Sequence, residues 1–383
     1  MDILELLKSD KNKILTHFNE VLKIKKRNLN REFSFDKVAN STINKGYLNG
    51  SKIDRIIFYL RSTGCEWSCT KMGGCFMCGH YFGTNMGDTL PKNSFYNQFL
   101  SEYNKYDFSK YPMICIYNAG SILNDNEIPR EELYRILNVI KRNNDIKRVV
   151  LESRPEFINV EVLNQISNIL NDKIVEIGIG LETSNDKVRE YCINKGFNFK
   201  NYLEKVKLIK NYSNIKTLTY VTVKLLFLTI DESIRDVIQT MKDLSGLTDI
   251  ISLEPISIQK NTLVELLYTN KLYDPPKGWI IKEILANLHN TNLMKNFELR
   301  IGGFEFFPIP DLFISNCNKC NKKLYDAIDI YNSTKDVNSI LTLSCDCYEE
   351  FKKKIYIENN TVSHIPLEER ICNSLEYFLY KSL

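Results

Sequence analysis

Cysteine is the residue type with the most chemical potential in this chain, and eight of its 11 cysteines fall into two tight groups. The first group comprises Cys65, Cys69, Cys75 and Cys78. In a reducing compartment, clustered cysteines are metal ligands more often than disulfide partners. Three thiolates on one loop can hold three irons of a [4Fe-4S] cluster and leave the fourth iron open, whereas four can enclose a structural zinc ion. Zinc ribbons join two pairs from separate turns, so four thiols on a single loop favour the cluster.

The second group consists of two close pairs, Cys317 with Cys320 and Cys345 with Cys347. Twenty-four residues separate the pairs, which is enough chain to bring four thiolates to one point. Such pairs commonly build a structural zinc site in a small region that lacks its own core. A second iron–sulfur cluster and reduced, unpaired thiols remain alternatives because spacing does not select the metal.

The elements around these cysteines alternate in character along the chain. Near-continuous apolar runs, typical of strands buried on both faces, occur at Ile56–Leu60, Met113–Tyr117, Val149–Leu151, Ile174–Ile179, Leu218–Leu226 and Asp249–Leu253. Amphipathic segments with helical spacing lie between or after them, at Phe95–Tyr103, Arg130–Lys141, Val160–Leu170, Asp186–Ile193, Tyr202–Ile209, Ile234–Leu244 and Ile280–Leu288. This alternation predicts an α/β fold of βα repeats, either a doubly wound sheet or a full or partial barrel.

The loop after the first apolar run helps to separate these two folds. A glycine-rich dinucleotide fingerprint would stand there in a nucleotide-binding doubly wound sheet, but the cysteine loop takes its place. This favours a barrel, in which catalytic groups gather at the carboxyl ends of the strands. The predicted organisation is a helical segment over residues 1–50, a partial barrel over 51–300 and a cysteine-containing extension over 301–383.

Composition sets weaker limits on partners and location. The net charge of +4 neither demands nor excludes nucleic acid. A basic cluster is either a solvated helix face or a phosphate-contacting patch, and it consists of Lys23, Lys25, Lys26, Arg27 and Arg31. The sequence lacks both the roughly 20-residue apolar run of a membrane span and the basic-then-apolar start of a signal peptide. We therefore expect a soluble, cytoplasmic protein without a membrane partner.

The cysteine loop resembles the cluster loop of radical S-adenosylmethionine (SAM) enzymes, in the widely spaced variant also found in the Elongator catalytic subunit. Nine residues separate Cys65 from Cys75 and two separate Cys75 from Cys78, as in that variant. The resemblance therefore implies that these three thiolates hold the [4Fe-4S] cluster. It leaves Cys69 as an additional thiol outside the ligand set.

Further segments occur in the order seen in the archaeosine synthase radical SAM family, and the resemblance spans residues 50–350 approximately. The segments are 73–79, 120–129, 152–156, 179–183, 193–197 and 261–265. Two segments, 274–279 and 313–317, depart from the family pattern on its substrate side. The resemblance implies a partial (β/α)6 TIM-like radical SAM barrel.

Specific residues acquire roles by this resemblance. Backbone groups at Gly120 and Ser121 would approach the methionyl ammonium of SAM. Glu152 and Arg154 stand two residues apart at the end of the third strand and would point the same way, suiting an ammonium and a carboxylate respectively. Glu182 resembles the position that binds the ribose hydroxyls.

The substrate side is less defined. Lys224 falls within an apolar strand pattern, where it would either face a charged substrate in the barrel lumen or extend to the rim. Glu254 follows the sixth strand, with Gln259 and Asn261, and would line the same mouth. We take Lys224 and Glu254 as the catalytic candidates. His80, beside the cluster loop, is a candidate for tuning the cluster.

By the same resemblance, the radical would abstract hydrogen from a lysine-bearing 7-deazaguanine base in transfer RNA, and carbon–nitrogen cleavage would leave an amidine. A paralogue acting on a small metabolite or peptide is the alternative among enzymes. A zinc-stabilised nucleic-acid-binding module is the alternative from another class. An electron donor, such as a reductase, flavodoxin or ferredoxin, and a partner subunit are further expected partners.

Overall fold

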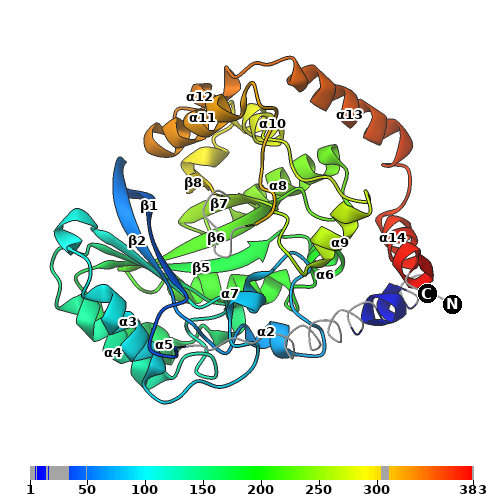
Figure 1. Cartoon of the computed structure of the whole chain (residues 1–383). Helices are drawn as coiled ribbons and strands as arrows, with labels where there is room; N and C mark the ends of the chain where they lie inside the picture. Colours follow the sequence, from blue (N-terminus) through cyan, green and yellow to red (C-terminus); the bar gives the residue numbers. More distant parts are fainter. Residues whose placement is uncertain are drawn as a thin grey trace.

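A curled eight-stranded sheet forms the centre of the molecule (Figure 1). The computed structural model describes residues 5, 7–13, 16, 34–48, 50–302 and 310–381. The strands follow one another across the sheet in the order of the sequence. They are β1 (Asn40–Leu48), β2 (Ser51–Tyr59), β3 (Met113–Tyr117), β4 (Arg148–Glu152), β5 (Ile174–Glu182), β6 (Ile215–Val223), β7 (Ile250–Pro255) and β8 (Glu298–Ile301). β1 runs antiparallel to β2, and β2 to β8 run parallel.

Helices follow the strands in βα order and cover the outside of the sheet (Figure 1). They include α3 (Ser94–Tyr103), α4 (Arg130–Lys141), α5 (Val160–Ile169), α6 (Asp186–Ile193), α7 (Phe199–Ile209), α8 (Ile230–Leu244), α9 (Leu263–Thr269) and α10 (Trp279–Leu288). All six predicted strands and all seven predicted helices occur within a few residues of their expected bounds. The partial TIM-like barrel of the α/β class is thereby confirmed.

Two strands were missed by the sequence pattern. β8 adds a seventh parallel strand to the expected six. β1 lies inside the segment expected to be helical, so the prediction of helix over all of residues 1–50 was wrong at residues 40–48. The basic cluster at Lys23, Lys25, Lys26, Arg27 and Arg31 lies outside the described residues.

The strands separate two apolar layers because successive side chains of a strand point to opposite faces. On β3, for example, Ile114 and Ile116 pack outward against the helices, while Met113 and Cys115 point into the lumen. The lumen layer is small and forms a floor. A cavity lies above this floor, toward the carboxyl ends of the strands, where barrel enzymes place their sites.

The chain ends in a helical extension beyond β8 (Figure 1). It contains α11 (Asn321–Thr334), α12 (Asn338–Leu341), α13 (Cys347–Thr361) and α14 (Leu367–Lys381). Among the described residues, every helix is too short or too polar to cross a membrane.

Candidate active site and metal centre

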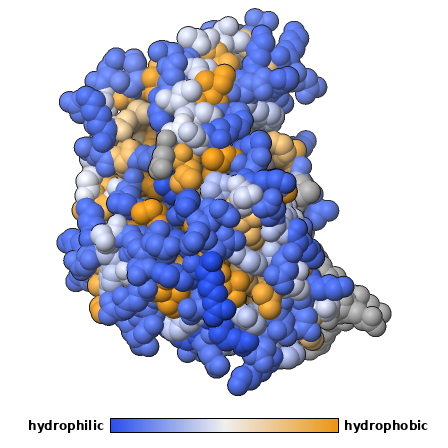
Figure 2. All heavy atoms as spheres, turned by 90° about the vertical axis from the view of Figure 1, so that its left-hand side faces the viewer, coloured by the Kyte–Doolittle hydropathy of each residue, from blue (hydrophilic) through white to orange (hydrophobic). Residues whose placement is uncertain are grey.

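One cavity of about 790 Å³ opens from the lumen floor to the loops after the strands. Its wall draws residues from β1 to β8, from the cysteine loop and from α11. Figure 2 looks at the molecule from the left-hand side of Figure 1. Apolar residues gather in a recess on this face. A cavity of this size can hold a cofactor together with part of a substrate.

The cysteine loop supplies Cys65, Cys75 and Cys78 to this cavity. Burial raises the pKa of Cys65 to about 11 and that of Cys78 to about 12, and the nearby Cys75 adds to both shifts. Three thiols on one loop that face a shared cavity suit a cluster with an open position, since iron would deprotonate them on binding. The residues present therefore fit the cluster that the sequence predicts.

Asn194, at the end of α6, fastens this loop to the barrel. Its side-chain amide donates hydrogen bonds to the carbonyl oxygens of Met72 (2.9 Å) and Gly74 (2.7 Å). Its own carbonyl accepts the indole N–H of Trp67 at 2.8 Å. The cysteines are thus held by the turn that follows β5 and α6, although they are distant in sequence.

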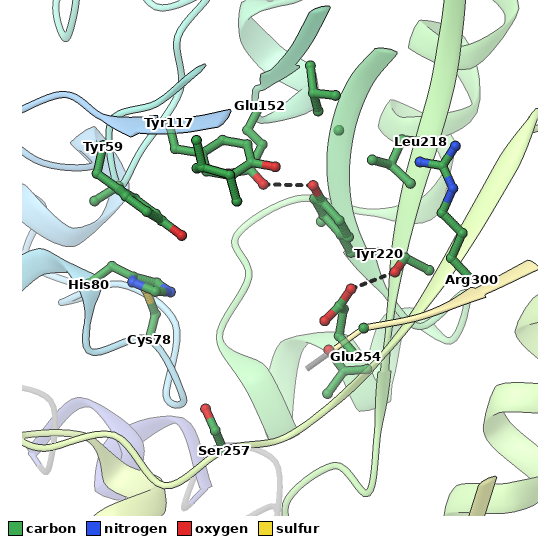
Figure 3. Close-up of a pocket in the computed structure, with 18 of the residues that line it drawn as sticks. Tyr59, Cys78, His80, Tyr117, Glu152, Leu218, Tyr220, Glu254, Ser257 and Arg300 are labelled. Atoms are coloured by element: carbon green, nitrogen blue, oxygen red, sulfur yellow. Dashed lines mark hydrogen bonds between the residues drawn. The ribbon is translucent and has the colours of Figure 1, made fainter. Parts of the chain in front are cut away.

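Cys69 stands apart from the other three thiols of the loop. It is exposed, and its Sγ lies 4.0 Å from the hydroxyl of Tyr81 rather than on the cavity wall. Its exclusion from the ligand set remains a prediction that fits this placement. His80, by contrast, does line the cavity, next to Cys78 (Figure 3).

A buried carboxylate that sequence reasoning overlooked links the cysteine loop to the loop after β3. Glu127 accepts hydrogen bonds from the backbone N–H of Glu66 (2.9 Å) and of Ser121 (2.5 Å). Gly120 lies against it: a Cβ there would come within 1.9 Å of the Glu127 carboxylate and 3.0 Å of the Cys65 Cα. The glycine therefore permits a close approach of the two loops. Glu127 belongs to segment 120–129, so its position in that motif was the available signal.

Glu152 and Arg154, the predicted pair, both line the cavity, but their side chains have different partners. Glu152 accepts a hydrogen bond from the hydroxyl of Tyr220 on β6 at 2.7 Å, over Gly178 of the intervening strand β5 (Figure 3). Arg154 instead lies at the cysteine loop, with its guanidinium 5.2 Å from the Trp67 ring and paired with Glu156 at 2.6 Å. Ser121 is buried, and its Oγ accepts the backbone N–H of Arg154 at 3.1 Å.

Glu182 sits on the cavity wall in an ion pair with Lys195 at 2.6 Å. It also accepts a hydrogen bond from Thr222. Although burial lowers it, the pKa of Lys195 is raised overall because Glu182 lies beside it. Glu182 adopts a left-handed conformation (φ 70°), with an irregularity in the pairing of β5 and β6. Lys195 is a further site residue that was missed, although it falls in segment 193–197.

Glu254 and Lys224, the two catalytic candidates, have different placements. Glu254 faces the cavity and accepts a hydrogen bond from Ser252 at 2.6 Å (Figure 3). Lys224 follows the end of β6 outside the cavity wall, where its ammonium donates to the carbonyl of Leu228. It lies 5.5 Å from the Tyr273 ring. The expectation that Lys224 lies within the strand is therefore wrong, because β6 ends at Val223.

Two carboxyl groups on the cavity wall have a raised pKa. Burial raises the pKa of Glu152 and of Glu254 to about 7, and Glu182 contributes to both shifts. Such groups change charge near neutral pH, which is a property common at functional sites. The cavity thus has a thiol side near Arg154 and a carboxyl side near Tyr220.

The second cysteine group assembles away from this cavity. The sulfur atoms of Cys317, Cys320, Cys345 and Cys347 all lie within 4.8 Å of one another. Neighbouring Sγ atoms are 3.5 to 3.7 Å apart, and the indole N–H of Trp279 donates to Cys347 Sγ at 3.3 Å. The two pairs predicted to meet do meet, in an arrangement that fits a metal.

Comparison with known proteins gives a consistent set of relatives. The chain is 29% identical to archaeosine synthase subunit beta of Methanosarcina acetivorans over 347 residues, covering 89% of this chain and 96% of that protein. It is 33% identical to the uncharacterized protein MJ0550 of Methanocaldococcus jannaschii, covering 80% and 83%. Archaeosine synthase subunit beta of Thermococcus kodakarensis is 29% identical and covers 55% and 65%. No family model matches the chain.

Solved structures resemble it at lower identity. The FeFe-hydrogenase maturase HydG of Carboxydothermus hydrogenoformans shares 14% identity at a TM-score of 0.45, covering 99% of this chain and 100% of that chain. The Elp3 protein of Methanocaldococcus infernus, with an N-terminal deletion, shares 13% identity at a TM-score of 0.46, covering 61% and 58%.

Proposed function

We propose that this chain, which belongs to the same family as the Methanocaldococcus jannaschii protein and resembles archaeosine synthase subunit beta, is a radical SAM enzyme that acts on a lysine-bearing 7-deazaguanine in transfer RNA. The reaction begins with hydrogen abstraction from the lysine arm, and carbon–nitrogen cleavage leaves an amidine. The observation that carries the proposal is that the three expected ligand thiols and the polar residues at the strand ends face one cavity. Lyase-type chemistry needs this shared space because radical and substrate must meet out of water.

On the thiol side, Cys65, Cys75 and Cys78 hold the [4Fe-4S] cluster. When bound, the cluster and SAM supply a 5′-deoxyadenosyl radical after one electron enters. Arg154 lies beside the cysteine loop, where its guanidinium suits the methionyl carboxylate. Glu182, held by Lys195, suits the ribose hydroxyls. The backbone at Gly120 and the buried Ser121 shape the wall between the loops rather than adding a side-chain ligand.

On the carboxyl side, Glu152 and Glu254 receive the lysine arm of the substrate. A carboxylate stabilises an ammonium strongly where water is excluded, and both groups are half-buried on the cavity wall. We propose Glu152 as a contact of the substrate rather than of SAM because its carboxylate bonds to Tyr220 on β6. Of the two segments that depart from the family, 274–279 ends at the start of α10 and 313–317 ends at the C-terminal cysteines, and Phe313 of the second segment lines the same cavity as these carboxyls.

Zinc is the proposed metal of the C-terminal group. Tetrahedral thiolates about 2.3 Å from zinc lie roughly 3.8 Å from each other, close to the 3.5 to 3.7 Å seen between neighbouring sulfurs. Cysteines of a four-iron cluster bind separate irons and stand roughly 6 Å apart. The 4.8 Å limit on all four sulfurs favours a single ion.

The relatives' name, archaeosine synthase subunit beta, supports a partner subunit and a transfer-RNA setting for this chain as well. A reductase, or a flavodoxin or ferredoxin, supplies the electron from outside.

The test is an anaerobic assay of the iron-reconstituted protein with dithionite and SAM. Chromatography measures 5′-deoxyadenosine with and without transfer RNA that carries the lysine-modified base, and mass spectrometry of the digested RNA detects the amidine. We expect the RNA to raise the yield and the amidine to appear. Cleavage of SAM that no such RNA stimulates would refute the substrate class. A protein that never yields 5′-deoxyadenosine would refute the radical chemistry itself.

A further inference from the structure

The sheet leaves an open seam beside the cavity. Among the described residues, its pairing runs from β1 to β8 without a further pair between β8 and β1. An unpaired edge exposes backbone N–H and C=O groups and needs a cover. The helix α11 supplies part of that cover, because Tyr325, Ile328, Asp329 and Asn332 of this helix line the cavity.

One end of this cover is fixed to β8 by Asn332. The backbone N–H of Ile301 donates to Asn332 Oδ1 at 2.9 Å, and Asn332 Nδ2 donates to the carbonyl of Ile301 at 2.8 Å. A single side-chain amide thus satisfies the two groups that a neighbouring strand would pair. Lys335 adds a hydrogen bond to the carbonyl of Leu299 at 2.9 Å.

The other side of the seam is fixed by Asp329. Its carboxylate accepts a hydrogen bond from the hydroxyl of Tyr47, on β1, at 2.9 Å. It also pairs with Lys52 on β2. Asp329 and Asn332 are three residues apart and are neighbours on one helix face. One turn of α11 therefore bridges the first and last parts of the sheet.

The C-terminal cysteines lie at the base of this bridging helix. Cys320 immediately precedes α11, and Cys347 is the first residue of α13. Trp279, which donates to the Cys347 sulfur, is the first residue of α10. A metal bound by all four thiolates would join the starts of α11 and α13 beside α10. Structural zinc adds its binding free energy to folding in such small regions.

We infer that a zinc ion bound by Cys317, Cys320, Cys345 and Cys347 holds α11 across the β1–β8 seam and thereby completes the wall of the substrate cavity. The C-terminal extension is then part of the reaction chamber although it contributes no cluster ligand. The inference uses the proposed zinc site but does not depend on the radical chemistry. Loss of zinc would release the bridge while the cysteine loop, on the other side of the cavity, keeps its own supports.

The first test compares Cys317→Ser with Cys372→Ser in the full-length, iron-reconstituted protein. Cys372 is buried in α14 and is not one of the four converging thiols, so it serves as the matched control. Elemental analysis should find about one zinc ion per chain in the parent and the control, and almost none in Cys317→Ser. Hydrogen exchange followed by mass spectrometry should show α11 exchanging at least roughly tenfold faster in Cys317→Ser. Peptides from β3 to β5 should change little.

Unchanged exchange in α11 after zinc is lost would overturn the inference, as would iron in place of zinc at the C-terminal group. If Cys317→Ser does not fold, brief treatment of the parent protein with a zinc chelator, followed by the same exchange measurement, gives the same decision. Neither readout requires SAM turnover, so failure of the proposed radical reaction would leave this result distinct.

A second variant separates the bridge from the metal. Asn332→Leu keeps a similar volume but removes both hydrogen bonds to Ile301. We expect full zinc content together with faster exchange in β8. Loss of zinc in this variant, or β8 exchange equal to that of the parent, would contradict the seam contact as the link between metal and cavity.

Discussion

The two cysteine groups differ in how they present sulfur. In the loop after β2, three thiols face a large cavity. In the C-terminal extension, four thiols converge within 4.8 Å and point at one another. Structural metal sites are closed by protein ligands, whereas catalytic sites keep a position open. The contrast fits the two proposed roles, reaction for the cysteine loop and assembly for the C-terminal group.

The sharpest way to break this comparison is to remove one thiol from the open group. Cys75→Ala should abolish 5′-deoxyadenosine formation because two thiolates cannot hold a site-differentiated cluster. Cys69→Ala should retain activity within roughly threefold, since this exposed thiol lies off the cavity wall. The assay is anaerobic chromatography with parallel iron and zinc analysis, and zinc should remain in both variants. Inactive Cys69→Ala protein that has lost iron would show that the ligand set was wrongly chosen.

Gly120→Ala probes how the open group is held. The new Cβ would meet Glu127 at 1.9 Å and the Cys65 backbone at 3.0 Å, so the carboxylate must leave its hydrogen bonds to Glu66 and Ser121. We expect 5′-deoxyadenosine formation to fall roughly 10- to 100-fold, because a small displacement of reacting groups costs that much. Zinc content should not change. Gly246→Ala is a control for general destabilisation, since its Cβ would meet nothing while its positive φ strains any side chain, whereas Gly120 is not among the positive-φ glycines. A loss of activity in Gly246→Ala equal to that in Gly120→Ala would indicate general destabilisation rather than displacement of Glu127.

Glu254→Gln tests whether the cavity faced by the cysteine loop binds an ammonium group of the substrate. Burial raises the pKa of Glu254 to about 7, so its carboxylate fraction falls as the pH drops below 7. Binding of an ammonium should therefore weaken between pH 8 and pH 6, with KM for the RNA substrate rising up to roughly tenfold per pH unit below the pKa. The glutamine variant should have a higher KM at pH 8 and a flatter pH profile, while SAM cleavage without RNA stays near the parent rate. A parent KM that is constant from pH 6 to pH 8 would argue against a carboxylate–ammonium contact.

A feature of these regions can be predicted from the sequence when the residues that produce it are neighbours along the chain. Apolar runs such as Met113–Tyr117 predict strands because burial on both faces leaves a continuous pattern. β8 has only four residues, two of them charged, so it carries no such run. Two close pairs of cysteines predict a shared metal site because the two thiols of each pair are held near each other by the short chain between them. Lys195 and Glu127 lie in recognised segments but were missed because only the fold brings them beside their partners, Glu182 and the backbone of Glu66.

Lys224 lies outside the cavity wall, so its substitution should change activity least. Its ammonium contacts the carbonyl of Leu228 and lies outside the cavity wall, so Lys224→Met should change substrate-dependent activity by less than roughly twofold. Burial lowers the pKa of Lys224 to about 8, below its ordinary value of 10.5. Between these two pH values the unfolded chain binds more protons than the native protein, so this residue makes the stability rise with pH there. The methionine variant should lack that rise when urea unfolding is compared at pH 7.5 and pH 9.5. A tenfold loss of activity in this variant would place Lys224 in contact with the substrate and extend the open region behind β6.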